Sequence, residues 1–198
     1  MSGDGVSAAT RAIAIDSADH VAYLFKGSLL FVSGQQETGL ADVRRAHELN
    51  PNHAHTLSAL GFSEAMMGEV RKGVEYTTQA LRLSPRDPSR WLLLNYQSWA
   101  HFAACDYVNA LESAQSAVSE APRMPSPRMC LVVSRMGLGQ LDRARADFQI
   151  LSGLAPELVQ TRLAGTWLSI DPGYKRRATT FMRIAAGLED PSAAEALR

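Results

Sequence analysis

The chain has 198 residues, of which 46% are hydrophobic, so it can bury a substantial core. Its 20 Lys and Arg residues balance 20 Asp and Glu residues, and this zero net charge argues against non-specific nucleic-acid binding, which requires clustered positive charge. The sequence contains no apolar run near the ~18 residues of a membrane span and no secretory signal. We therefore expect a cytoplasmic protein with neither a nucleic-acid nor a membrane partner.

Four prolines recur at a nearly constant interval. They are separated by 34, 37 and 34 residues: Pro51, Pro85, Pro122 and Pro156. A small residue lies 17 positions before each of them: Gly34, Gly68, Cys105 and Gly139. A fixed period of this length is typical of stacked helical hairpins. The spacing predicts an all-α fold, a right-handed superhelical helix-turn-helix repeat array with a helical C-terminal cap.

Residues 1–19 match the second half of a repeat. When the frame is moved back by 34 residues, the pair 11–12 (Arg-Ala) falls on the pair 45–46 (Arg-Ala). We expect a half-repeat whose first helix is missing, and a half-unit leaves an apolar face uncovered. Our hypothesis is that the chain is the C-terminal portion of a longer protein. The alternative is a natural N-terminal capping helix, because terminal repeats are often atypical.

We expect four repeat units, at residues 20–53, 54–87, 88–124 and 125–158, each with a first helix A and a second helix B. In the first unit, helix A is predicted at residues 20–33 and helix B at residues 36–49. Gly27 in helix A and Gly39 in helix B recur as Gly61 and Gly73. Because a glycine inside a helix costs ~1 kcal/mol against alanine, we expect these glycines to let the two helices approach closely.

The third and fourth units depart from the first two. The third has three more residues, which we expect at the start of its helix A. Asp87 and Ser126 each precede a proline, a pattern that predicts an N-cap followed by proline at the first helical position. The fourth unit has Val132 and Leu151 where earlier units have small residues, which indicates a degenerate unit near the end of the array.

The period is lost after Pro156. Residues 157–169 and 174–188 have the pattern of amphipathic helices, the second with Phe181, Ile184 and Leu188 on one face, and residues 191–197 indicate a short terminal helix. We expect residues 159–198 to form a helical extension that covers the last stacked face.

The landmarks resemble the tetratricopeptide (TPR) pattern over about residues 5–158. They stand at its eighth, twentieth and twenty-seventh positions: Gly27 and Gly61; Ala110 and Ala144; Ala46, Ala80 and Ala117. The prolines stand at its thirty-second position, whereas Ser98, Val132 and Leu151 depart from the pattern. The resemblance implies a module that binds a protein or a peptide.

A narrower resemblance involves residues 83–91 and 100–111. These segments are similar to the C-terminal TPR regions of bacterial class III adenylate cyclases and of some winged-helix regulators, which also have a lengthened unit after a Ser-Pro-Arg-Asp-Pro segment. The catalytic domain of that family is absent from this chain. The resemblance therefore implies regulation or partner binding in a bacterial signalling protein, and no enzymatic activity for this chain.

The sequence contains no catalytic or nucleotide-binding motif. His53 and His55 are two residues apart, whereas paired metal ligands on a helix are four apart, so we expect solvated turn histidines. We expect no metal and no cofactor. The carboxylates of Glu64, Glu69 and Glu75 are expected on solvated helix surfaces.

The two cysteines, Cys105 and Cys130, show neither metal-binding nor redox spacing. Both lie among small or apolar neighbours, and we expect buried free thiols in a reducing compartment.

The tetratricopeptide resemblance implies that the A helices line a concave face. From the inward positions we predict a partner-binding set: Leu24, Phe31, Phe62, Met66, Asn95, Trp99, Phe102, Met129 and Met136. The inward positions contain no Lys or Arg, so the carboxylate clamp of chaperone-binding members is expected to be missing. An apolar groove suits an apolar or amphipathic helix, and aromatic residues and methionine are frequent at interfaces. The alternative is that these side chains are core, covered by the chain's own tail.

Three functions are compatible with this pattern. The leading one is a non-catalytic protein-interaction or regulatory module that binds an apolar helix or peptide, or self-associates, through the concave face. The alternative is a sensor that binds a small molecule or peptide in a cavity with convergent polar groups such as Ser28, Asn95 and His101. A hydrolase or transferase would need clustered acid-base residues, which the sequence does not show.

Overall fold

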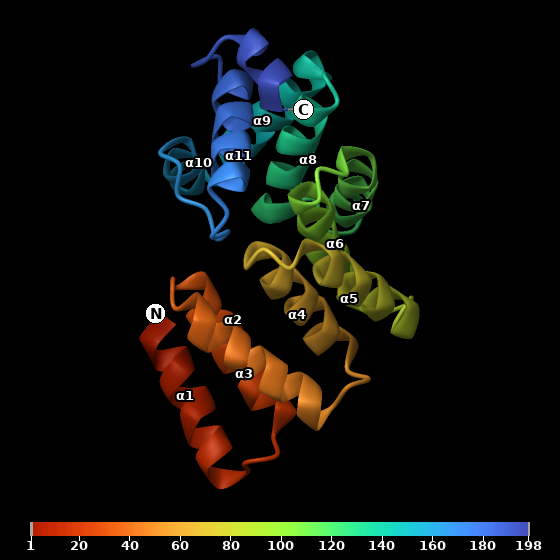
Figure 1. Ribbon diagram of the computed structural model, residues 1–198, viewed down its shortest axis with the longest axis vertical. Helices are drawn as coiled ribbons and strands as arrows, with labels where there is room; N and C mark the ends of the chain where they lie inside the picture. The colour runs from red at the N-terminus through yellow and green to blue at the C-terminus, as the bar shows by residue number, and fades with distance from the viewer. Residues whose placement is uncertain (1, 198) are drawn as a thin grey trace.

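The computed structural model describes residues 2–197, which form eleven α-helices and one 3-10 helix without any β-strand. The helices pair into antiparallel hairpins that stack along the long axis of the molecule (Figure 1). The predicted all-α helix-turn-helix array is confirmed. Within the same residues, no helix is both long enough and apolar enough to cross a bilayer.

The hairpins alternate between two series of helices. The A helices are α2 (His20–Val32), α4 (Ala54–Met66), α6 (Arg90–Ala103) and α8 (Pro125–Gly137). The B helices are α3 (Gln36–Leu49), α5 (Val70–Leu83), α7 (Tyr107–Glu120) and α9 (Leu141–Leu154). The chain begins with α1 (Ser2–Ile15) and ends with α10 (Pro156–Leu163), α11 (Pro172–Ala185) and the 3-10 helix η1 (Pro191–Leu197).

Each hairpin turns at a residue in the left-handed backbone conformation. These residues have positive φ angles of 95°, 95°, 58° and 73°: Gly34, Gly68, Cys105 and Gly139. At the first turn, the Gly34 N–H donates to the Phe31 carbonyl and the Gln35 N–H to the Leu30 carbonyl. This is the hydrogen-bond pattern of a Schellman motif, and it recurs at the other three turns. The 17-residue spacing in the sequence therefore marks the residue that ends each A helix.

The matched glycines bring the two helices of a hairpin together. A Cβ atom on Gly27 would lie 2.6 Å from the backbone oxygen of Gly39, and one on Gly61 would lie 2.7 Å from the backbone oxygen of Gly73. Because no side chain fits at such distances, glycine at these positions permits direct backbone packing.

The third hairpin differs from its predicted form. The loop 84–89 has six residues where the loop 50–53 has four, and α6 has 14 residues where α4 has 13. Two of the three extra residues therefore lie in the loop and one in the helix. Asp87 stabilises this loop by accepting hydrogen bonds from the Ser89 N–H at 2.8 Å and the Ser84 hydroxyl at 3.0 Å. The predicted caps are wrong, because α6 begins at Arg90, after Ser89, and α8 already begins at Pro125.

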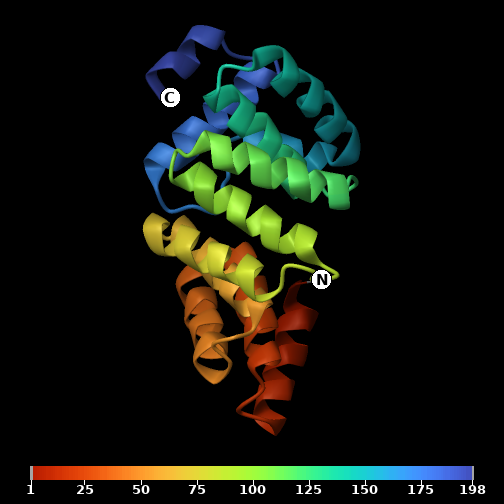
Figure 2. The same cartoon turned by 90° about the vertical axis from the view of Figure 1, so that its right-hand side faces the viewer.

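The C-terminal extension folds back along the stack. The helix predicted over residues 157–169 ends at Leu163, because Gly165 takes a left-handed conformation with φ 86°. In the loop that follows, the Ile170 N–H donates to the Met66 carbonyl at 3.0 Å. Figure 2 shows the C-terminal helices, in blue, along one side of the upper hairpins, with this loop reaching down to α4. Phe181 and Ile184 of α11 are buried as predicted, whereas Leu188 is exposed.

Two predictions about polar and thiol groups are wrong. Cys130 is buried, and this burial raises its pKa to about 12, but Cys105 lies exposed in its turn. Glu64 is buried rather than solvated, and its two carboxylate oxygens accept hydrogen bonds from Arg44 at 2.9 and 3.0 Å. This ion pair joins α3 to α4.

Candidate functional site

Most of the predicted partner-binding side chains are packed inside the protein. Phe62 is partly buried, and the other eight are buried: Leu24, Phe31, Met66, Asn95, Trp99, Phe102, Met129 and Met136. These side chains therefore do not form one open groove along the A helices.

The C-terminal extension covers the part of the concave face formed by α6 and α8. The Trp99 ring lies 6.1 Å from the ring of Trp167, and the Phe102 ring lies 5.3 Å from that of Tyr174. A cavity of about 60 Å³ remains between the extension and the A helices, with Met66 and Met129 in its wall. This half of the concave face is filled by the chain itself.

Polar side chains under the extension form a partly buried chain of hydrogen bonds. The Trp99 indole N–H donates to the Ser126 hydroxyl at 3.0 Å, and that hydroxyl donates to the side-chain oxygen of Asn95 at 3.0 Å. Because buried polar groups are costly when unpaired, this chain fixes the Asn95 amide as part of the structure.

The extension also brings arginines to this face, which the repeat pattern did not indicate. The Arg162 guanidinium lies 5.2 Å from the ring centre of Trp167, and that of Arg177 lies 5.5 Å from the ring centre of Phe102. Burial lowers the pKa of Arg162. Both arginines come from residues after the repeats, so the inward positions of the A helices gave no signal for them.

The part of the concave face formed by α2 and the first half of α4 remains open. A groove of about 340 Å³, here called the inner groove, has these residues in its wall: Val21, Leu24, Phe25, Ser28, His53, His55, Ala59 and Tyr96. Phe25 is 61% exposed, whereas Ala59, 34 positions later, is only 5% exposed. An exposed phenylalanine beside an apolar hollow is a feature of ligand and partner sites.

Histidines form the rim of the inner groove. The ring centres of His20 and His53 are 4.9 Å apart, and those of His53 and His55 are 5.9 Å apart. His55 pairs with Asp87, with 3.2 Å between Nε2 and Oδ1. Burial, followed by the neighbouring His20 and His55, lowers the pKa of His53. In the part of the chain that the structure describes, no three His, Cys, Asp or Glu side chains are grouped to hold a metal ion.

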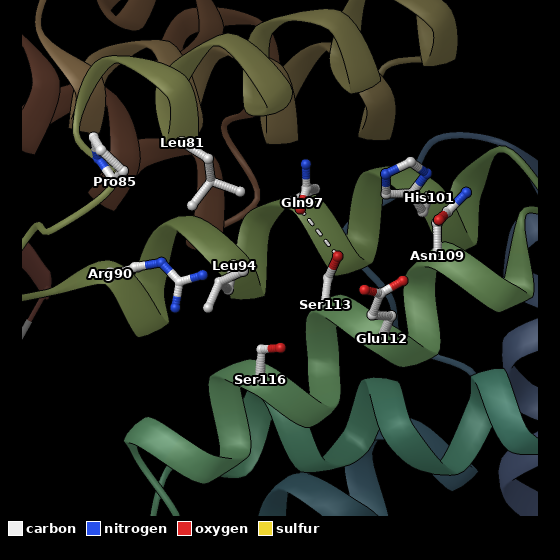
Figure 3. A pocket seen from close by; sticks show the side chains of 10 residues that line it. All are labelled: Leu81, Pro85, Arg90, Leu94, Gln97, His101, Asn109, Glu112, Ser113 and Ser116. Carbon is white, nitrogen blue, oxygen red and sulfur yellow. Dashed lines mark hydrogen bonds between the residues drawn. The ribbon is translucent and has the colours of Figure 1, made fainter.

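A second groove, here called the outer groove, opens between α5, α6 and α7 (Figure 3). Its volume is about 450 Å³, and polar side chains of α6 and α7 point into it. Many of them bond within the protein: the Ser113 hydroxyl donates to Gln97 at 3.0 Å, and His101 lies 3.0 Å from Asp106. Their hydrogen-bonding capacity is therefore largely used by the fold.

The three polar residues considered for a small-molecule cavity lie in different places. Ser28 lines the inner groove, Asn95 is buried, and His101 lines the outer groove. They do not converge on one cavity.

Comparisons with solved structures place this arrangement among repeat proteins. YrrB, described as a TPR protein with an unusual peptide-binding site, is 18% identical, with 96% of this chain and 97% of that chain covered and a TM-score of 0.55. MamA from AMB-1 is 19% identical, with 87% and 90% covered and a TM-score of 0.56. PilW, described as a widely conserved type IV pilus biogenesis factor, is 16% identical, with 92% and 80% covered and a TM-score of 0.67.

No protein-family model matches the sequence, and no curated protein matches it. At these identities, the structural likeness shows the fold alone. The chain has the fold of a tetratricopeptide-repeat array.

Proposed function

We propose that the protein is a non-catalytic interaction module whose inner groove holds an apolar or amphipathic helix, or an apolar peptide, of a partner protein. The observation that carries this proposal is Phe25, which is 61% exposed at the edge of the inner groove. Burying a phenylalanine side chain is worth about 1.5–3 kcal/mol. A partner that covers Phe25 and the neighbouring Val21 would gain this free energy.

The chain's own α11 supports a helical occupant. Its buried residues Tyr174, Ala178 and Phe181 follow the i, i+4, i+7 spacing of one helix face, and Tyr174 and Phe181 lie against Phe102 of α6. The half of the concave face that is occupied is thus covered by an amphipathic helix. The open half presents the same kind of surface, since apolar side chains of A helices form it.

The inner groove is favoured over the outer groove on physical grounds. A ligand in the outer groove would have to replace bonds that the protein already makes, such as the one between Ser113 and Gln97, and such exchanges contribute little net free energy. A ligand in the inner groove would remove apolar surface from water instead. YrrB, which has the same fold, is described as having a peptide-binding site, and this likeness in fold is a further reason to expect peptide binding.

The proposal is tested by selecting a displayed library of 16-residue peptides on the protein and on two matched variants. Ser28→Arg places a long charged side chain in the inner groove, and Ser116→Arg does the same in the outer groove. We expect peptides with apolar residues at helical spacing that bind the protein and Ser116→Arg but lose at least tenfold in affinity for Ser28→Arg. Peptides that bind Ser28→Arg as well as the unchanged protein would overturn the proposal.

Self-association through the same groove is the competing outcome. In light scattering, self-association would appear as a dimer of the unchanged protein that Ser28→Arg does not form.

We also propose a bacterial signalling context in the cytoplasm. The similarity of residues 83–91 and 100–111 to the C-terminal regions of class III adenylate cyclases supports it, and so do the free thiols of Cys105 and Cys130. The coding region upstream of this chain in the genome provides the test, since a cyclase or DNA-binding domain there would support the context and an unrelated domain would contradict it.

A further inference from the structure

Helix α1 repeats the B helices in length and phase. It has 14 residues, like α3 and α5, and the three helices begin at residues 2, 36 and 70, each 34 after the last. The same shift aligns Gly5 with Gly39 and with Gly73. This register supports the interpretation of α1 as a B helix.

The three aligned glycines have different surroundings. A Cβ atom on Gly39 would lie 2.6 Å from the backbone oxygen of Gly27 in α2, and one on Gly73 would lie 2.7 Å from that of Gly61 in α4. A Cβ atom on Gly5 would meet a single side-chain atom, Cδ1 of Leu29, at 2.8 Å. Among residues 2–197, no helix backbone lies against Gly5 in the way that an A helix lies against its counterparts.

The neighbours of Gly5 show the same difference in burial. Ala46 and Ala80 are fully buried under their A helices, but Ala12, at the same position of α1, is only half-buried.

An open groove of about 380 Å³ runs between α1 and α2 and is here called the terminal groove. Most of its lining residues are apolar: Gly5, Ala8, Ala9, Ala12, Asp19, Val21, Ala22, Phe25 and Leu29. In Figure 1, α1 and α2 lie side by side at the end of the stack. A helix in the terminal groove would therefore lie against α1 as α2 lies against α3 and as α4 lies against α5.

We propose that the terminal groove binds one further helix of the A type, about 13 residues long, amphipathic, and with a glycine or alanine against Gly5. The chemistry of this occupant follows from the first two hairpins, in which an A helix of this length contacts the aligned glycine through a glycine of its own. A helix with a large side chain at that point would be held away from α1. The terminal groove shares Val21 and Phe25 with the inner groove, but its wall on α1 belongs to it alone. Gly5→Leu and Ser28→Arg therefore test the two grooves separately.

The register allows a sharp test. Residue 36 begins α3 directly after the turn 33–35, and residue 2 stands 34 positions before it at the start of α1. A fusion in which a copy of residues 20–35 precedes residue 2 of the full chain therefore supplies an A helix in phase with α1. We expect the fusion to unfold about 5 °C higher than the unfused chain, since a shift of 2–4 °C corresponds to ~1 kcal/mol in a chain of this size.

Local protection identifies where the added helix lies. Phe25→Cys, in a Cys105→Gly background that removes the exposed native thiol, reports access to the terminal groove through its rate of reaction with a thiol reagent. We expect the rate to fall at least tenfold in the fusion. We expect Gly5→Leu to restore it, because the leucine occupies the space of the approaching backbone, while Ser28→Arg on the inner groove leaves the protection intact.

Three outcomes would overturn the proposal. In the first, the fusion shows no protection at position 25. In the second, a fusion with a scrambled copy of residues 20–35 protects equally. In the third, the unfused chain forms dimers in light scattering that Gly5→Leu abolishes, which would make a second copy the occupant. If Gly5→Leu destabilises the unfused chain, Ala9→Leu provides a second block of the same groove.

Discussion

Tyr174 of α11 meets Phe102 of α6 edge to face, with ring centres 5.3 Å apart and ring planes at 85°. This contact joins the extension to the repeat array across 72 positions of sequence. Aromatic pairs in this geometry add about 0.5–1.5 kcal/mol beyond the burial of their surface. The extension is therefore part of the core of the array, and the aromatic residues beneath it have a structural role in this state.

Replacing Phe102 with alanine should destabilise the protein by about 3–5 kcal/mol, because the side chain is fully buried and a cavity would remain. Urea unfolding followed by circular dichroism measures this change. Val108→Ala, on the exposed side of α7, is the control and should change stability by less than about 0.5 kcal/mol. Equal effects of the two substitutions would show that α11 does not pack on Phe102 in solution.

Two glycines in helices should respond oppositely to alanine. Gly27→Ala places a Cβ atom 2.6 Å from the Gly39 oxygen and should cost more than about 2 kcal/mol. A Cβ atom on Gly153 in α9 meets nothing within 4 Å, so Gly153→Ala should stabilise the protein by about 0.5–1 kcal/mol. Thermal unfolding of the two variants tests this, and a stabilising Gly27→Ala would rule out the close backbone packing.

Cys105→Gly should stabilise the protein by about 0.5–1 kcal/mol. Cys105 has φ 58° at a turn where the other three hairpins have glycine, and this conformation costs a residue with a Cβ atom roughly 1–2 kcal/mol. Part of the gain is offset because glycine makes the unfolded chain more flexible. The midpoint of urea unfolding should rise, whereas Cys105→Val, with a branched Cβ, should lower it.

The ion pair between Arg44 and Glu64 should contribute through the buried carboxylate. The Glu64 side chain is 5% exposed and that of Arg44 is 53% exposed. Arg44→Ala leaves a buried charge unpaired and should cost about 1–2 kcal/mol, moderated by water at the exposed side. A double-mutant cycle with Glu64→Gln measures the coupling. Arg45→Ala, which removes an exposed pair with Glu48, is the matched control and should leave the stability unchanged.

Stability should fall as the pH decreases from about 7 to 5, and His53 should account for part of the loss. Burial, then His20 and His55, lowers the pKa of His53 in the folded state. The unfolded chain, with a histidine pKa near ~6.5, therefore binds this proton more readily than the folded chain, so protonation favours unfolding. His53→Gln should make the loss between pH 7 and 5 shallower in urea titrations.

Asp87 does not interfere with that measurement. Burial alone would raise its pKa, but hydrogen bonds from Ser89 and Ser84 together with His55 lower it. The stability that Asp87 contributes is present above its unfolded pKa of ~3.9 and is lost only as the pH falls below that range. An unchanged slope in His53→Gln between pH 7 and 5 would show that His53 titrates equally in both states.

The spacing of residues in the sequence was enough to determine the helical hairpins. Gly34 and Gly68 end their A helices, and Gly27 meets Gly39 only twelve positions away. These contacts form between near neighbours in the chain and recur with the period. Their physical requirements, a positive φ angle or the absence of a Cβ atom, can therefore be recognised from residue type and spacing.

The state of the concave face was decided by tertiary structure alone. Trp99 and Phe102 have the pattern of an inward aromatic stripe whether water, a partner or the chain's own tail covers them. The covering residues, Trp167 and Tyr174, lie in a segment that follows no repeat, and its path depends on contacts such as that between Ile170 and Met66. Periodicity cannot encode a contact made once between distant segments, and for this reason only the fold shows that one half of the concave face is filled while the inner groove stays open.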